Sequence, residues 1–138
     1  MKLSDKPSCS CGGCGCGSEK GKNIIIFACA GVANTGQLTN LAAVQLTQEG
    51  FGSAACVALL ANGPEGLLKA VKDSDGVLIL DGCNSKCAGK IAADKGIVPC
   101  QHVIVTDLGI KKAGSSEYTD DDIEEIVSAV WEGKGMTK

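Results

Sequence analysis

Cysteines are the residues of this chain best suited to chemistry, because nine of its 138 residues are cysteine. Cys83 and Cys87 follow the apolar segment at residues 76–82 and lie four positions apart. On one helical turn, Cβ atoms at this spacing are about 5–6 Å apart, whereas a disulfide needs about 3.8 Å. A metal ion between the two sulfur atoms therefore fits this spacing better than a covalent bond.

Two further cysteines can complete a metal site with this pair. One ends the first apolar segment and the other lies inside the second, so the predicted ligand set is Cys29, Cys56, Cys83 and Cys87. Four thiolates would form a closed tetrahedral shell around zinc, with Zn–S distances of about 2.3 Å. Such a shell leaves no open position and favours a structural, sensing or metal-handling role over hydrolysis. The alternative for Cys56 is a core residue, since free cysteine packs as a small hydrophobe.

A second cluster of cysteines lies in the N-terminal arm, residues 1–22. Its pattern is C-x-C-x2-C-x-C, with Cys9, Cys11, Cys14 and Cys16. Glycines let the chain wrap around an ion, so four thiolates could enclose one soft ion such as Zn²⁺ or Cu⁺, or could hold an iron–sulfur cluster. The spacing matches neither the standard cluster motif nor a zinc finger. We expect a flexible arm with a second metal site. The alternatives are a metal-scavenging tail without a dedicated function and an arm that lends metal to the domain site or removes it.

Redox chemistry at the same cysteines is the alternative hypothesis. Cys83 and Cys87 can hold an iron–sulfur cluster or transfer a persulfide, because a helix N-terminus lowers the pKa of a thiol.

A phosphatase of the C-x5-R type is excluded, since position 35 holds threonine and the chain has no arginine. His102 begins a predicted strand and is expected far from Cys83, which argues against a Cys–His catalytic pair. A third hypothesis is a binding module that presents the glycine-rich segment 30–37 to an anion or a protein.

The elements that must position these cysteines can be read from hydrophobic patterns. Continuous apolar segments predict four buried strands, at residues 23–29, 53–60, 76–82 and 102–109. Helical periodicity between and after them predicts helices capped by Asn34 or Thr35, by Ser85 and by Thr119. This alternation predicts a single three-layer, Rossmann-like or flavodoxin-like α/β domain over residues 23–138, with a mainly parallel four-stranded sheet of order 2-1-3-4.

The predicted sheet separates the cysteines into two groups. Ligands of such sheets bind at the carboxyl ends of the strands, where Cys29 and Cys83 should lie. Cys100 precedes the fourth strand and is expected at the opposite edge as a structural residue. Asp81 is expected to support the turn or to accept backbone N–H bonds.

Charge and composition restrict the partners. The net charge of -3 and the absence of arginine argue against nucleic acid, because no basic stripe could neutralise phosphates. No stretch of 18 uninterrupted apolar residues and no signal-peptide core are present, so we expect a cytoplasmic protein without membrane contact. The expected partners are a metal ion and a redox or metal-delivery protein.

Four blocks of the sequence together carry a resemblance to a known family. They are "CAGVANTGQLTN", "ACVALL", "LDGCNSKCA" and "HVIVTDLGIKK", spread over about residues 24–112. In this order they resemble the DGC-domain family of zinc-binding proteins, named after its Asp-Gly-Cys tripeptide. The resemblance implies a small α/β domain whose zinc ligands correspond to Cys29, Cys56, Cys83 and Cys87. The cysteine-rich arm lies outside the matching region.

Overall fold

Four short parallel strands form the centre of the protein in a computed structural model that describes residues 22–137. They are β1 (Ile24–Ala28), β2 (Ser53–Ala55), β3 (Gly76–Asp81) and β4 (Gln101–Ile104). Their order in the sheet is β2-β1-β3-β4, with every neighbouring pair parallel. The predicted α/β fold class and strand order are therefore confirmed.

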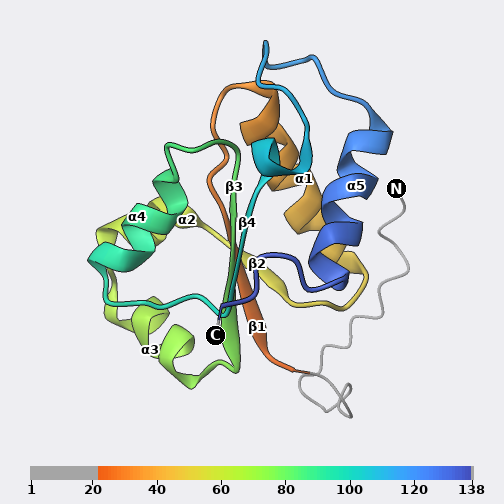
Figure 1. The fold of residues 1–138 in the computed structure, drawn as a ribbon. Helices are drawn as coiled ribbons and strands as arrows, with labels where there is room; N and C mark the ends of the chain where they lie inside the picture. The colour runs from red at the N-terminus through yellow and green to blue at the C-terminus, as the bar shows by residue number, and fades with distance from the viewer. Residues whose placement is uncertain (1–21, 138) are drawn as a thin grey trace.

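Helices cover both faces of this sheet (Figure 1). One face carries α1 (Asn34–Gln48) and α5 (Asp120–Trp131), and the other carries α2 (Val57–Asn62), α3 (Glu65–Asp73) and α4 (Cys87–Asp94). A 3-10 helix, η3 (Val105–Leu108), follows β4. None of the helices described is long and apolar enough to cross a bilayer.

The two layers of helices enclose two hydrophobic cores. Side chains along β1 alternate between them, as expected for a strand that is buried on both faces. Ile24 and Ile26 pack with residues of α1 and α5, whereas Ile25 and Phe27 pack with residues of α2 and α4. This sandwich fixes the strands in register, so their carboxyl ends meet along one edge, at the top of Figure 1.

The last helix begins as the sequence predicts. Thr119 caps α5 by accepting a hydrogen bond from the Asp122 N–H, and the Asp122 carboxylate accepts one from the Thr119 N–H. This capping box satisfies two amides that would otherwise lack a partner. The predicted caps of α1 are wrong, because Ala33 is the capping residue and makes no side-chain hydrogen bond.

Two predicted strands end earlier than expected. Residues 53–60 were predicted as one strand, but β2 ends at Ala55 and the rest turns into α2, which Gly63 ends at φ 70°. Residues 102–109 likewise split into β4 and η3, which Gly109 ends at φ 94°. Short apolar segments suit a strand and a buried helix equally, so periodicity alone could not separate them.

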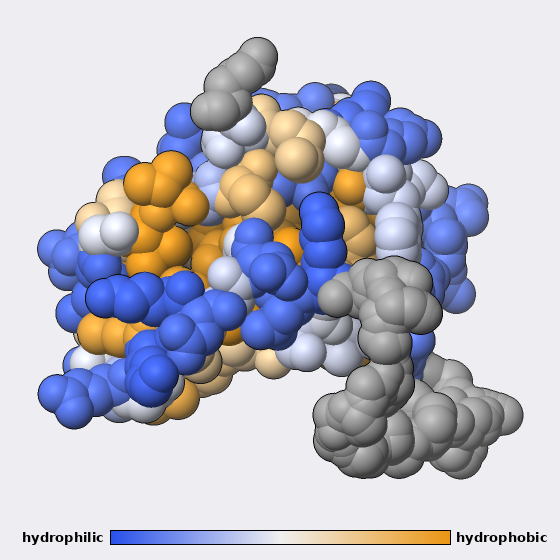
Figure 2. All heavy atoms as spheres, turned by 90° about the horizontal axis from the view of Figure 1, so that it is seen from below, coloured by the Kyte–Doolittle hydropathy of each residue, from blue (hydrophilic) through white to orange (hydrophobic). Residues whose placement is uncertain are grey.

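The opposite edge of the sheet, seen from below in Figure 2, shows hydrophobic side chains between hydrophilic ones. A cavity of about 370 Å³ opens there against the start of β3, lined in part by Leu68, Val71, Ile97 and Val98. Cys100 also lies at this end, since its N–H donates to the Val77 carbonyl and its sulfur lies against Gly76. Its predicted position away from Cys83 is confirmed.

Candidate functional site

Three cysteines from separate elements line one cavity of about 230 Å³ at the carboxyl ends of β1 and β3. Cys29 directly follows β1, Cys83 follows β3 after a single glycine, and Cys87 is the first residue of α4. These positions follow from the parallel sheet, in which the ends of neighbouring strands lie side by side. The structure thus brings together three of the four cysteines predicted as domain ligands.

Cys83 has the most polar surroundings of the three. The Ser85 N–H and then the Ser85 hydroxyl donate hydrogen bonds to its sulfur, and both lower the pKa of the Cys83 thiol. Partial burial acts in the opposite direction, while the Lys112 ammonium lowers this pKa further. Lys112 Nζ lies 3.5 Å from Cys83 Sγ. Hydrogen bonds and a nearby cation favour the thiolate form of Cys83.

The loop that carries Lys112 is fixed by a buried asparagine. Asn34, which is 2% exposed, donates through Nδ2 to the carbonyls of Lys111 (2.9 Å) and Glu117 (3.1 Å). Its Oδ1 accepts from the Ala113 N–H at 2.6 Å, and its own N–H donates to the Ala113 carbonyl at 3.2 Å. Because these bonds hold the chain on both sides of Lys112, the first turn of α1 positions the cation beside Cys83.

Cys29 is held differently. Its sulfur accepts a hydrogen bond from the Gly82 N–H at 3.4 Å and lies 3.7 Å from Thr39 Oγ1. The Thr39 hydroxyl donates its own hydrogen to the Gly36 carbonyl at 2.6 Å. In its contact with Cys29, the Thr39 hydroxyl is then left to act as an acceptor. Cys29 is thus held by its neighbours in the same cavity as Cys83.

Cys87 is exposed at the start of α4, and Asp81 supports that helix end from below. The buried Asp81 carboxylate accepts from the Ala88 N–H at 2.8 Å and the Gly89 N–H at 3.0 Å. The predicted role of Asp81 as an acceptor of backbone N–H bonds is confirmed. The predicted cap Ser85 is wrong, because Lys86 occupies the capping position in a left-handed conformation. Ser85 is instead oriented toward the Cys83 sulfur.

His102 completes the support of α4. Its Nε2 lies 2.8 Å from Asp81 Oδ2, and its ring lies outside the cysteine cavity. A Cβ atom at Gly89 would be 2.6 Å from His102 Cε1, so only glycine allows this ring to approach the helix. The side chain therefore reaches closer to the Asp-Gly-Cys turn than its place in β4 suggested, but its partner is the carboxylate.

Backbone atoms approach one another closely behind the cavity. A Cβ atom at Gly36 would lie 2.5 Å from the Gly31 carbonyl carbon, and one at Gly82 would lie 2.8 Å from the Gly36 nitrogen. The turn before Cys83 is therefore packed directly against the first turn of α1. Ala30 and Lys86 are the two non-glycine residues with positive φ in residues 22–137, at 54° and 51°. Each adjoins a cavity cysteine, and such conformations concentrate at functional sites.

The fourth predicted ligand, Cys56, does not share the cavity of the other three. It directly follows β2 and caps α2, whereas the sequence suggested a place inside a strand. The Ala55–Phe27 pairing puts it near the end of β1, yet its exposed side chain caps α2 and accepts from the Leu59 N–H at 3.4 Å. It does not line the cavity.

Comparison with known proteins now assigns the chain to a family. The family model of the DGC domain matches residues 25–130. The chain belongs to the DGC domain family. It is also 26% identical over 102 residues to the anaerobic and virulence modulator AnvM of Pseudomonas aeruginosa, in an alignment that covers 74% of this chain and 78% of that protein. No solved structure matches the chain.

Metal binding by this DGC domain stays a prediction. Zinc prefers thiolate ligands, and three cysteines around one cavity are chemically suited to it. Within residues 22–137, however, no three side chains of Cys, His, Asp or Glu are placed as a ligand set. The arm cysteines Cys9, Cys11, Cys14 and Cys16 lie outside the described residues, and with them the predicted second site.

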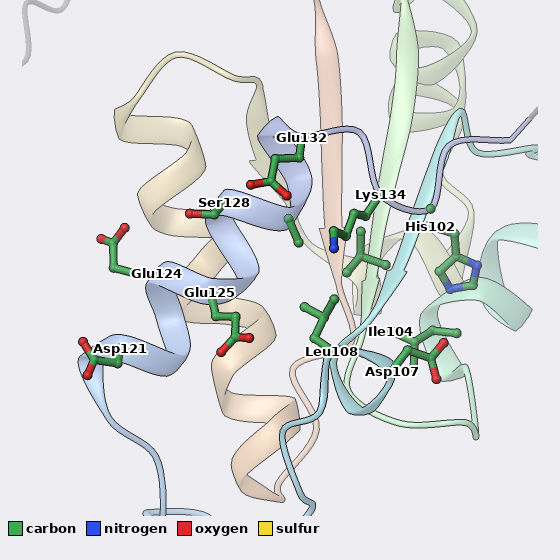
Figure 3. A pocket seen from close by; sticks show the side chains of 13 residues that line it. His102, Ile104, Asp107, Leu108, Asp121, Glu124, Glu125, Ser128, Glu132 and Lys134 are labelled. Atoms are coloured by element: carbon green, nitrogen blue, oxygen red, sulfur yellow. The ribbon is translucent and has the colours of Figure 1, made fainter.

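A larger cavity of the DGC domain lies elsewhere, between β4, η3 and α5, with a volume of about 680 Å³. It contains no cysteine, and its carboxylates belong to Asp107, Asp121, Glu124, Glu125 and Glu132. Figure 3 shows the four that belong to α5 and its end spread along the helix rather than gathered at one point. Its size therefore does not make it the better candidate for chemistry.

Two residues of the site were missed by sequence reasoning, Asn34 as an anchor and Lys112 as a partner of Cys83. The lysine follows the carboxyl end of β4, the same edge of the sheet as the cysteines. Because a parallel sheet brings these ends together, its place in the sequence was the signal that could have identified it. The contacts of Asn34 span up to 83 positions and leave no local pattern.

Proposed function

We propose that this DGC domain carries out thiol chemistry with the Cys83 thiolate as nucleophile and the Cys29 and Cys87 thiols beside it. The observation that carries this proposal is the 3.5 Å contact of Lys112 Nζ with Cys83 Sγ, which joins the two Ser85 hydrogen bonds on the same sulfur. The thiolate is the reactive form of cysteine, and a lowered pKa increases its population near neutral pH.

The cavity supplies the other requirements of a thiol site. Cys83 is partly exposed, so a small molecule can reach it, and Cys87 lines the same space with an exposed side chain. Cys87 could therefore attack a persulfide or a mixed disulfide that forms on Cys83. The anaerobic role named for AnvM is compatible with a site whose thiols must remain reduced.

The test is the pH dependence of alkylation by iodoacetamide, followed for each cysteine by peptide mass spectrometry on the full chain. We expect Cys83 to react first and its rate to reach half-maximum below the ordinary thiol pKa of about 8.5. Lys112→Met should move this midpoint upward, whereas the control Lys111→Met should not. A Cys83 that titrates like an ordinary thiol, with no effect of Lys112→Met, would contradict the proposal.

A soft metal ion, zinc first, is the second candidate, because Cys29, Cys83 and Cys87 line one cavity. When bound, zinc would supply a fixed positive centre, and these three thiols are the groups that would hold it. Elemental analysis of the full chain with its four arm cysteines changed to serine tests this candidate. One equivalent of zinc that is lost in Cys83→Ser but kept in Cys56→Ser would favour a three-thiolate site. Zinc lost in both variants would favour the four-cysteine shell predicted from the sequence.

A further inference from the structure

We propose that the cavity beside Cys83 binds a small sulfur oxyanion of the thiosulfate class, with its oxygens at the start of α1 and its outer sulfur toward Cys83. The proposal rests on the proposed function, since it needs the Cys83 thiolate. It adds a binding subsite made by Thr35, Gly36 and Lys112, all of which line the cavity.

The first turn of α1 contains backbone N–H groups that have no hydrogen-bond partner among the described residues. This helix is 15 residues long, has no acidic residue in its first turn and has no side-chain cap. The Asn34 N–H is taken by the Ala113 carbonyl, and the Gln37 N–H by the Ala33 carbonyl. For the N–H groups of Thr35 and Gly36, residues 22–137 provide no hydrogen-bond partner. Such amides at a helix N-terminus, together with the helix dipole, favour an anion.

A second, independent observation is the Thr35 side chain. The residue is 1% exposed and lines the cavity. Its hydroxyl receives no hydrogen bond from any described residue and donates none to one. A hydroxyl on a buried residue that has no protein partner is left to bond a ligand or a water molecule in the cavity that the residue lines. This hydroxyl therefore points to a polar ligand in the space that Cys83 shares.

The charges around the cavity favour a negatively charged ligand. Lys86 and Lys112 line it, and Asp81 is its one carboxylate among the described residues. The oxygens of Asp81 are already occupied by two backbone amides and His102. The close packing of Gly82 on Thr35 and Gly36 brings the anion donors next to the turn that carries Cys83. A ligand with a negatively charged end and a reactive sulfur fits both the donors at the start of α1 and the Cys83 sulfur.

Thiosulfate has this composition and fits a cavity of about 230 Å³. The Cys83 thiolate would attack its outer sulfur, so that a sulfur–sulfur bond forms on Cys83 while the sulfur–sulfur bond of thiosulfate breaks. The electron pair of the broken bond leaves with sulfite, and Cys83 becomes a persulfide anion. No external oxidant or reductant is needed. Attack of cyanide on the outer sulfur of this persulfide gives thiocyanate and restores the thiolate.

The experiment uses the full chain with its arm cysteines changed to serine, thiosulfate as sulfur donor and cyanide as acceptor. We expect sulfite and thiocyanate to appear in equal amounts, and Cys83 to gain one sulfur atom by mass spectrometry when cyanide is left out. Sulfate should compete with thiosulfate. Thr35→Val should raise the KM for thiosulfate at least tenfold, while the alkylation of Cys83 by neutral iodoacetamide stays unchanged.

Two controls separate a binding role from a structural one. Thr35→Ser keeps the hydroxyl and should restore most of the affinity for thiosulfate. Thr106→Val removes a buried hydroxyl that has no partner among the described residues and lies away from this cavity, and it should leave the KM unchanged. A reactive Cys83 that gains no sulfur from thiosulfate, with no competition by sulfate, would overturn this inference alone. A Cys83 that alkylates like an ordinary thiol would overturn the proposed function as well.

Discussion

Asn34 holds the backbone on both sides of Lys112, through three side-chain hydrogen bonds and one backbone bond. Lys112 is thereby placed beside a sulfur that comes from a different part of the chain. The ammonium of a long, flexible side chain is a weak determinant of a thiol pKa when its backbone moves freely. Anchoring that backbone to α1 makes the electrostatic effect on Cys83 persistent.

Asn34→Ala should therefore change both stability and reactivity. Three side-chain bonds at about 1 kcal/mol each predict a loss of roughly 2–3 kcal/mol in the free energy of unfolding, measured by urea denaturation. The pH midpoint of Cys83 alkylation should also rise, because Lys112 is no longer held in place. A variant that loses stability but keeps the wild-type midpoint would show that the anchor does not act on Cys83.

The lowered pKa of Cys83 predicts a pH-dependent stability. In the folded state this thiol ionises below its ordinary pKa of about 8.5, so its thiolate stabilises the fold fully above that value. The contribution is lost as the pH falls through the lowered pKa. The stability of the wild type relative to Cys83→Ser should therefore increase with pH across this window. Urea denaturation under reducing conditions at several pH values checks this, and Lys112→Met should weaken the trend.

Asp81→Asn should weaken the start of α4. The buried carboxylate accepts two backbone N–H bonds and contacts His102. An amide offers one oxygen, so its NH2 group would face a backbone donor, which predicts a loss of about 2–3 kcal/mol. Thermal unfolding by circular dichroism measures the loss. Amide hydrogen exchange should show faster opening of residues 87–94, and unchanged exchange there would argue against this role of Asp81.

Gly82→Ala tests the backbone contact behind the cavity. Its new Cβ atom would meet the Gly36 nitrogen at 2.8 Å and the Thr35 carbonyl carbon at 2.9 Å. Overpacking of this kind predicts a loss of about 1–3 kcal/mol, together with altered alkylation of Cys83. Gly66→Ala is the matched control, because nothing lies within 4 Å of its Cβ position on α3. That change should be neutral or should stabilise the helix by about 0.5–1 kcal/mol.

The sheet and much of the cysteine cluster could be predicted because their signals are local. The continuous apolar residues of β1 and β3 mark buried strands, and parallel topology then brings Cys29 and Cys83 to one edge. Cys56 shows where this reasoning ends. Its apolar surroundings suit a strand and a helix equally, and the choice depends on Leu60 being buried between α2 and α4. That is a tertiary contact.

Polar partners were the least predictable part of the site. Ser85 had the sequence position of a helix cap, yet its hydrogen bonds go to Cys83 because Asp81 already satisfies the first amides of α4. Competition between two acceptors for the same donors is decided by three-dimensional distance. Lys112 likewise contacts Cys83 only because the loop after η3 is held against the start of α1.

The contact of Gly82 with the Thr35–Gly36 peptide also determines how large a molecule the cavity can admit. A wall made of main chain cannot swing aside by rotation about side-chain bonds. Widening the space would require α1 to shift as a whole against a core in which Leu38 and Leu46 are fully buried. Bulky thiol reagents should consequently react slowly with Cys83 even when it is ionised, because the main chain limits the size of the molecules that can enter the cavity.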